Sequence, residues 1–411
     1  MPESPPATNY GATMYRKSDP RSAWQPYMAP SIDPPVPIDS LLAQVERLEQ
    51  EAGPMSQALT EPLGWLSAAY LAENRLPTAI KYLTRGIHLT RINDGLFAPS
   101  QTEMLEQLIS AHIRRGDFVA ADDYQHYLYR VQSFHQRHAG NAKLQEATLR
   151  YADWMRGAYL GDIDPLRYPR LVGLNDLYVN AIDELVENQG HTSPELLPYL
   201  QGRVELSYLI SVYPGEDTAD FRAGAPRKTD YPMSVEAELR FWRLRDHNFR
   251  YGLEALQHTE EIVAADPEST PQDRAQARIA RADWYQWHRR YAAAIRLYEE
   301  AWAIMEGEDG AAPWLQATLG TPLELPQGTV FNPGFVPLGT PNNAEVNVGF
   351  QVSRHGAATN IEILTEKIDD ATQSAANRAY HYLRNMRFRP RLENGKVVAS
   401  APIQLAYQIR Y

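Results

Sequence analysis

The sequence lacks cysteine altogether across its 411 residues. Disulfide bonds and thiolate metal sites are therefore excluded, and the absence is compatible with either side of a bacterial inner membrane. Also lacking is any run of roughly 20 apolar residues, the length of a helix that crosses a bilayer. Residues 1–6 have neither a basic region nor an apolar core, so they do not form an intact signal peptide. Either the numbering begins at a processed or artificial start, or the chain is cytoplasmic.

The sequence also has no excess of basic residues over acidic ones. The formal net charge is -11, which argues against a nucleic-acid partner held through its phosphates. The only local gathering of basic residues is Arg384, Arg387, Arg389 and Arg391, which we expect to lie solvated along a strand edge. Hydrophobic residues make up 44% of the chain, enough for two or three domains with their own cores.

Motifs of catalysis are absent as well. The sequence has no glycine-rich phosphate loop, no nucleophile elbow and no His-Glu-x-x-His. His135 and His138 share one helix face with His126 two turns earlier, but no third ligand stands at a diagnostic spacing. We therefore expect these histidines to be solvated or hydrogen-bonded, and we predict no metal site and no cofactor.

Two Asp-Trp pairs, Asp153-Trp154 and Asp283-Trp284, stand in similar local sequences. A pair of acids would suggest glycosidic chemistry only if the two carboxylates met in a cleft. The similar local sequences are explained more simply if the two pairs belong to related repeats. We expect a protein that is not an enzyme. A buried acid or histidine with a strongly perturbed pKa in a cleft would favour the enzymatic alternative.

Residues 1–37 are rich in proline and poor in apolar side chains. Such a segment buries too little surface to offset the entropy of ordering, so we predict that it is extended or disordered. One alternative is a spacer, and the other is a terminus held locally on the next domain by Trp24 and Tyr27. The prolines are Pro2, Pro5, Pro6, Pro20, Pro26, Pro30, Pro34, Pro35 and Pro37.

Residues 38–310 have helical periodicity nearly throughout. Two stretches have the spacing of a tetratricopeptide repeat, in which small residues let two antiparallel helices approach and large ones fill the gap between them. A weaker copy runs from Leu105 to Ala121, and more degenerate pairs should lie between because repeats need neighbours. The two stretches are Leu63, Leu66, Ser67, Tyr70, Ala79, Leu83 and Gly86, and then Ala282, Tyr285, Ala294, Tyr298 and Ala301.

Further helical runs are predicted over 144–159, 171–188, 195–212 and 235–265, each ended by glycine or proline. Residues 215–232 are predicted to form a long loop that interrupts the repeats, either functional or packed on the convex face. Residues 311–339 combine prolines with large apolar residues. We predict that this connector packs on the last repeats.

The last stretch, residues 340–411, changes period. Val346, Val348, Phe350 and Val352 alternate as a strand with one buried face, and Ile361 and Ile363 continue as a second strand after a turn. A helix is expected from Asp369 or Asp370, with its inward positions three and four residues apart. A final strand closes the chain. The helix positions are Ala375, Ala379, Leu383 and Met386, and those of the last strand are Ile403, Leu405, Tyr407, Ile409 and Tyr411.

This stretch resembles the C-terminal domain of the TonB family, the periplasmic proteins that transmit energy to outer-membrane transporters. The similarity comprises the alternation 346–352, Gly356, residues 360–363, the alanine-rich helix running into 387–390, and 394–398. It covers about the last sixth of the chain. The family's usual Tyr-Pro before the first strand is replaced here by the Gly-Thr-Pro-Asn-Asn of 339–343. The predicted fold is multidomain and mainly α, a tetratricopeptide-like solenoid followed by a small α+β (ββαβ) TonB-like domain.

The resemblance implies a function in protein binding. In the family, the last strand of this domain pairs with a short segment of the transporter, so strand addition is expected here, with affinity from backbone groups. The resemblance also favours a periplasmic location, with the proline-rich segment as a spacer from an anchor. The alternative is a scaffold subunit in which this domain mediates assembly. The sequence leaves open membrane association through an anchor or partner, and oligomerisation. The expected partner-binding residues are Ile403, Gln404, Leu405, Ala406, Tyr407 and Gln408.

Overall fold

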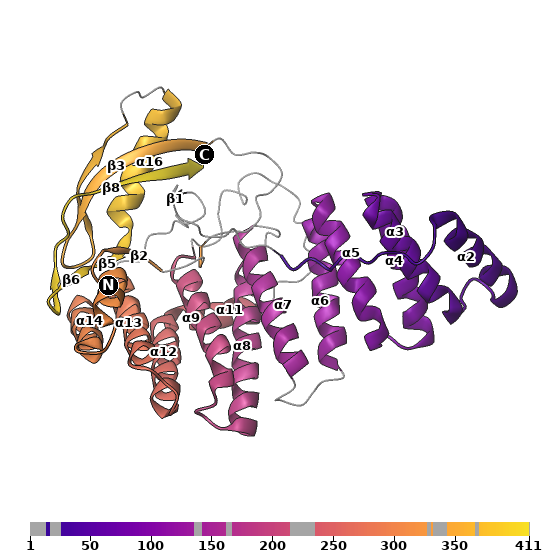
Figure 1. Ribbon diagram of the computed structural model, residues 1–411, viewed down its shortest axis with the longest axis horizontal. Helices are drawn as coiled ribbons and strands as arrows, with labels where there is room; N and C mark the ends of the chain where they lie inside the picture. Colours follow the sequence, from indigo (N-terminus) through magenta and orange to yellow (C-terminus); the bar gives the residue numbers. More distant parts are fainter. Residues whose placement is uncertain are drawn as a thin grey trace. The chain divides into compact units, whose positions relative to one another are not determined.

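The computed structural model describes residues 14–16, 26–134, 142–161, 167–213, 235–326, 330–331, 343–365 and 370–410. The protein is mainly helical, with a small region of sheet near its C-terminus (Figure 1). Its contacts divide the described residues into two compact units. The N-terminal unit lies within residues 25–165, and the C-terminal unit combines residues 14–16 with residues 167–410. In the described part of the chain, no helix has both the length and the apolar composition to cross a membrane.

The N-terminal unit is a succession of helices in which each packs against the next along the chain. Short 3-10 turns, η1 (Gln57–Leu59) and η2 (Pro99–Gln101), precede the two helices that start at threonine. The helices are α2 (Ile38–Ala52), α3 (Thr60–Ala72), α4 (Leu76–Asn93), α5 (Thr102–Arg115), α6 (Phe118–Phe134) and α7 (Ala142–Leu160).

The first helix pair, α3 and α4, is packed as its sequence spacing predicts. Ser67 and Ala79 are completely buried where the two helices approach. Gly86 faces α5, and a Cβ atom there would lie 2.5 Å from the Met104 sulfur. A larger residue at this position would therefore require the Met104 side chain to move. The large members of the pattern, Leu63, Leu66, Tyr70 and Leu83, are buried as well.

The C-terminal unit continues the same arrangement of packed helices. α8 contacts α9 and α11, α9 contacts α12, and α12 and α14 both contact α13. Before α9 stands the 3-10 turn η3 (Pro194–Leu196). The helices are α8 (Arg167–Gln189), α9 (Leu197–Ser211), α11 (Val235–Asp246), α12 (Asn248–Ala265), α13 (Pro271–Trp287), α14 (Tyr291–Met305) and α15 (Ala311–Thr318).

The single helical run predicted for residues 235–265 is wrong, because the chain breaks between α11 and α12. His247 leaves helical geometry, and its ring nitrogen Nδ1 lies 3.0 Å from the carbonyl oxygen of Arg243. Asn248 is buried and donates from Nδ2 to the carbonyl oxygen of Ser207 on α9, at 2.8 Å. These polar contacts fix the break, and apolar periodicity carries no signal for them.

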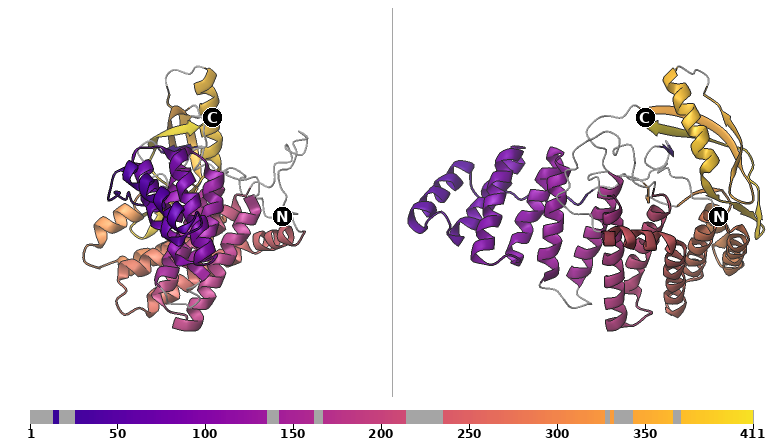
Figure 2. Two further views of the ribbon diagram at one scale, coloured as in Figure 1. Left: turned by 90° about the vertical axis from the view of Figure 1, so that its right-hand side faces the viewer. Right: turned by 180° about the vertical axis from the view of Figure 1, so that it is seen from behind.

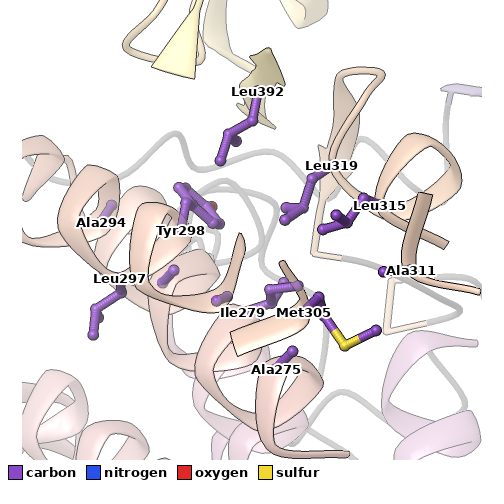
Figure 3. Packing of buried hydrophobic residues seen from close by; sticks show 12 residues of the cluster. Ala275, Ile279, Ala294, Leu297, Tyr298, Met305, Ala311, Leu315, Leu319 and Leu392 are labelled. Carbon is purple, nitrogen blue, oxygen red and sulfur yellow. The ribbon is translucent and has the colours of Figure 1, made fainter. Parts of the chain in front are cut away.

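The last helix pair, α13 and α14, forms one hydrophobic cluster of the C-terminal unit. α13 begins with a capping box between Thr270 and Asp273 and has Pro271 in its first turn, a combination that satisfies otherwise unpaired backbone donors. Ala282, Ala294 and Tyr298 are completely buried at the positions predicted from the repeat spacing. Leu392, from the C-terminal strands, completes the cluster and lies beside Tyr298 and Leu319 (Figure 3).

Within the described residues, the principal sheet has four strands in the order β1, β8, β3, β4, all paired antiparallel. α16 (Asp370–Asn385) packs across one face of this sheet (Figure 2). Two further two-stranded sheets pair β2 with β5 and β6 with β7. The strands are β1 (Met14–Arg16), β2 (Leu323–Leu325), β3 (Asn343–Val352), β4 (Ala358–Ile363), β5 (Arg387–Arg389), β6 (Arg391–Glu393), β7 (Lys396–Val398) and β8 (Ile403–Arg410).

Several predicted segments fall partly or wholly outside the described residues. The predicted loop 215–232 lies entirely outside them. Of the connector 311–339, the structure describes α15, which joins the α13–α14 core, and β2, which pairs with β5. Of residues 1–37, predicted to be extended or disordered, residues 14–16 form strand β1.

Candidate strand-addition site

β8 presents one apolar face and one polar face, as its alternation predicts. Tyr407 and Ile409 are completely buried, and Ile403 and Leu405 are half-buried on the same side. In the register of the sheet, Tyr407 lies opposite Val346 and Leu405 lies opposite Val348. Since directly opposed residues share a face of an antiparallel pair, the predicted inward positions of β3 and β8 form one apolar layer beneath α16.

The opposite face of the sheet is polar. Gln404 is exposed, and Ala406 and Gln408 are half-buried. Gln408 donates from Nε2 to Oε2 of Glu345, the residue opposite it on β3, at 3.2 Å. Each predicted binding residue therefore has a defined place, with three on the apolar face and three on the polar face. A sheet solvated on one side can add a strand without exposing a new apolar surface.

The outer edge of β8, where strand addition is expected, already carries a strand of the same chain. β1 pairs antiparallel with β8, placing Met14 opposite Ile409, Tyr15 opposite Gln408 and Arg16 opposite Tyr407. Among the described residues, Ile403 to Ala406 pair only with β3. The chain's own N-terminal segment thus occupies the C-terminal end of the edge. Nothing in residues 340–411 could have indicated this contact, because the paired strand lies more than 380 residues away.

The buried Tyr407 side chain links β8 to the connector. Its hydroxyl donates to Oε1 of Glu324, a buried residue of β2. β2 in turn pairs with β5, with Glu324 opposite Phe388. Phe388 lies 5.5 Å from Phe350 of β3, measured between ring centroids. One of the predicted binding residues is therefore also part of the structure that holds the sheet in place.

β5 carries a buried ion pair with α13. The Arg389 guanidinium donates from Nε to Oδ1 of Asp283, at 2.9 Å, and from Nη2 to Oδ2, at 2.6 Å. Arg389 is only 1% exposed, so the prediction that it is solvated along a strand edge is wrong. An Arg fork matches the two oxygens of a carboxylate, which makes this geometry favourable in a buried site.

Further donors complete the surroundings of Asp283. The Tyr298 hydroxyl donates to Oδ1 at 2.8 Å, and Arg389 Nη1 donates to the carbonyl oxygen of Thr318 at 3.0 Å. Burial raises the pKa of Tyr298 well above its usual value, and the Asp283 carboxylate raises it further. The hydroxyl therefore stays protonated and available as a donor. Asp283 on α13 is thus linked to a residue of α14 and a residue of β5.

Three more contacts fix the C-terminal strands on the α13–α14 pair and on the connector. Gln286 donates from Nε2 to the carbonyl oxygen of His355 at 2.6 Å. The Leu392 amide donates to the carbonyl oxygen of Leu319 at 2.7 Å. Lys396 lies 2.7 Å from a carboxylate oxygen of Glu299, measured from Nζ. The sheet bearing β8 is thus attached to the last helix pair through α13, α14 and the connector.

The other candidate residues are in ordinary structural contacts. His126 lies 2.9 Å from the Tyr151 hydroxyl through Nδ1, and His135 and His138 lie outside the described residues. Asp153 accepts from Arg156 at 2.9 Å, so the two Asp-Trp pairs have different partners. Over the part of the chain that the structure describes, no three histidine or acidic residues are grouped to hold a metal ion.

One histidine has a strongly perturbed pKa. Burial, with a smaller contribution from the nearby Arg290 charge, lowers the pKa of His288 from 6.5 to about 4. Its ring is packed edge-on against Trp284, at 4.3 Å, and Phe249, at 5.0 Å. The surroundings are aromatic, so the shift reflects packing next to α12.

Comparisons with known proteins do not assign a family. No protein-family model and no curated protein matches the chain. Among solved structures, the chain is similar to the crystal structure of BtubC (BKLC) from P. vanneervenii, with 14% sequence identity and a TM-score of 0.34. The similarity covers 66% of this chain and 91% of that one.

Proposed function

We propose that this protein is a non-catalytic adaptor of the bacterial periplasm, in which tetratricopeptide-like repeats carry a TonB-like C-terminal domain. The sequence resemblance over residues 346–398 supports the domain assignment. The order of β3, β4, α16 and β8 agrees with it. The buried small residues of the α3–α4 and α13–α14 pairs support the repeat assignment.

The pairing of β1 with the outer edge of β8 carries the functional proposal. This pairing supports the view that the edge can take up an antiparallel strand. The proposed partner is an extended segment of an outer-membrane transporter or of an envelope complex subunit, added along Ile403 to Gln408. Backbone hydrogen bonds supply affinity, and side-chain positions supply selectivity. The segment should be apolar opposite Ile403 and Leu405, and polar or small opposite Gln404 and Ala406.

One observation favours the alternative of a structural scaffold. The buried Asp283–Arg389 pair fixes the TonB-like domain to the last helix pair, whereas a domain that follows a moving transporter would need a looser attachment. In the scaffold, the same edge of β8 would pair with another subunit of a periplasmic assembly.

Site-specific photocrosslinking in intact cells tests the proposal. A photoreactive residue replaces Gln404, which is exposed on the polar face near the outer edge. Its matched control replaces Glu362, which is also exposed. Gln404 lies opposite Gly349, and Gly349 lies opposite Glu362 on β4, at the other edge of the sheet. The two positions therefore lie at the same level across the sheet and on the same face, and they differ only in which edge strand carries them.

The crosslinked peptides identify the partner by mass spectrometry. The proposal expects a crosslink from position 404, and not from position 362, to an extended segment of an outer-membrane transporter or envelope subunit. A crosslink from position 404 to a second copy of this chain supports the scaffold. Equal crosslinking from both positions, or none from position 404, contradicts strand addition at β8.

A further inference from the structure

The N-terminal strand stands where a partner strand would be expected. β1 is antiparallel to β8 and pairs with residues 407–409, and residues 407 and 408 belong to the predicted binding strand. A sheet edge offers one row of backbone donors and acceptors, and each group in it can pair with one strand at a time. An incoming segment that covers Tyr407 and Gln408 must therefore displace β1.

We propose that residues 14–16 act as an intramolecular gate on the β8 edge, a closed state that partner strands open by displacement. This inference rests on the proposed function, because it assigns regulation to the same edge. Over the described residues, β1 pairs with three residues of β8, whereas β3 pairs with eight. A strand of three residues makes few ladder hydrogen bonds, each worth little net free energy. Displacement is therefore feasible for a longer partner.

The gate predicts a specific cost in affinity. If the closed state outnumbers the open state by about ten to one, the apparent dissociation constant is about tenfold larger than that of the open protein. Removing the gate should therefore lower the apparent dissociation constant about tenfold. The variant Tyr15→Pro/Arg16→Pro removes the gate in the full chain. Successive amides of a strand point to opposite sides, so one of the two prolines must delete a donor facing β8.

The absence of cysteine in the chain provides a direct test of closure. Tyr15 and Gln408 are directly opposed, and opposed residues of antiparallel strands have Cα atoms about 4.5–5.5 Å apart, within the range of a disulfide. The variant Tyr15→Cys/Gln408→Cys should therefore form a bond on mild oxidation that locks β1 in place. Its control, Tyr15→Cys/Glu362→Cys, places the second cysteine on the far edge of the sheet, where no bond should form.

The binding probe is a fluorescent peptide of residues 10–20, added in trans and followed by anisotropy. We expect the double-proline variant to bind it about tenfold more tightly than the wild type. The oxidised Tyr15→Cys/Gln408→Cys variant should lose binding and recover it on reduction. A peptide carrying the same two prolines should not bind.

Three outcomes would overturn the gate. A disulfide that fails to form, or forms equally in the control, means that β1 does not rest on β8. If the oxidised and reduced cysteine variants bind the peptide equally, the pairing of β1 does not block the edge of β8. Equal binding by the wild type and the double-proline variant would lead to the same conclusion. None of these results bears on crosslinking at position 404, so failure of the gate is distinct from failure of the proposed function.

Discussion

Arg389 of β5 forms a bidentate, buried ion pair with Asp283 of α13, with donor–acceptor distances of 2.9 and 2.6 Å. The two residues are separated by 106 positions in the chain. Their side chains join the C-terminal strands to the helices that precede them. Removing either partner would leave the other charge buried without compensation, which is far more costly than losing an exposed pair.

Arg389→Met should therefore destabilise the C-terminal unit by about 3–5 kcal/mol, the usual cost of breaking a buried pair. The measurement is equilibrium urea unfolding of the full chain. Arg391→Met is the matched control, because Arg391 lies two residues away and pairs with the exposed Glu393. It should cost under about 1 kcal/mol. Equal effects of the two substitutions would show that Asp283–Arg389 is not the main attachment.

Gly356 should be intolerant of a side chain for two separable reasons. Its φ angle is +70°, and a Cβ atom would collide with Gln286 Nε2 and with the carbonyl oxygen of Phe388. Gly356→Ala should cost at least about 2 kcal/mol from backbone strain and crowding together. Gly310→Ala has a similar φ of +75° with nothing within 4 Å, so it isolates the backbone cost of about 1 kcal/mol. Thermal unfolding of the two variants gives the difference.

Tyr407→Phe tests whether the predicted binding strand is also a structural element. The substitution keeps the ring and removes the hydroxyl that donates to the buried Glu324. An unsatisfied buried acceptor should cost about 1–3 kcal/mol. Tyr380→Phe on α16, where the side chain is 39% exposed, should change stability by less than about 0.5 kcal/mol. A Tyr407→Phe variant as stable as the wild type would mean that Glu324 does not depend on this donor.

His288 should make stability depend on pH. Its pKa is lowered from 6.5 to about 4 in the folded protein, so between these values the unfolded chain binds a proton that the folded chain does not. Stability should therefore fall as pH decreases from about 6.5 to 4, by up to about 3 kcal/mol. His288→Phe keeps an aromatic ring and should flatten this part of the profile. Urea midpoints measured at several pH values compare the two proteins, and parallel profiles would contradict the assignment.

The periodic parts of the fold could be predicted from the sequence. The alternation of Val346 to Val352 and the repeat spacing around Ala79 and Ala294 reflect burial, which depends on residue type and local period. These positions are buried as expected. The helix boundary at His247 could not be predicted in this way, because it depends on side-chain hydrogen bonds that periodicity does not reveal.

The contacts that attach and cover the candidate site could not be predicted in the same way. The sequence context of Asp283 indicates a residue shared between repeats, and that of Arg389 indicates a basic group solvated along a strand edge. Their pairing depends on the docking of two distant segments. β1 lies in a proline-rich segment that was predicted to be extended or disordered. Within that segment, Met14 to Arg16 belong to the interval between Pro6 and Pro20, which contains no proline. A proline-free interval is compatible with pairing but does not identify the partner strand.

Hydrogen exchange of the β8 amides tests the central claim most directly, with the partner segment identified by crosslinking at position 404. The account predicts that adding this segment to the full chain slows exchange within Ile403 to Gln408, while β4 amides at the opposite edge of the sheet are unchanged. A segment that binds and leaves the exchange of β8 unaltered would contradict strand addition at this edge.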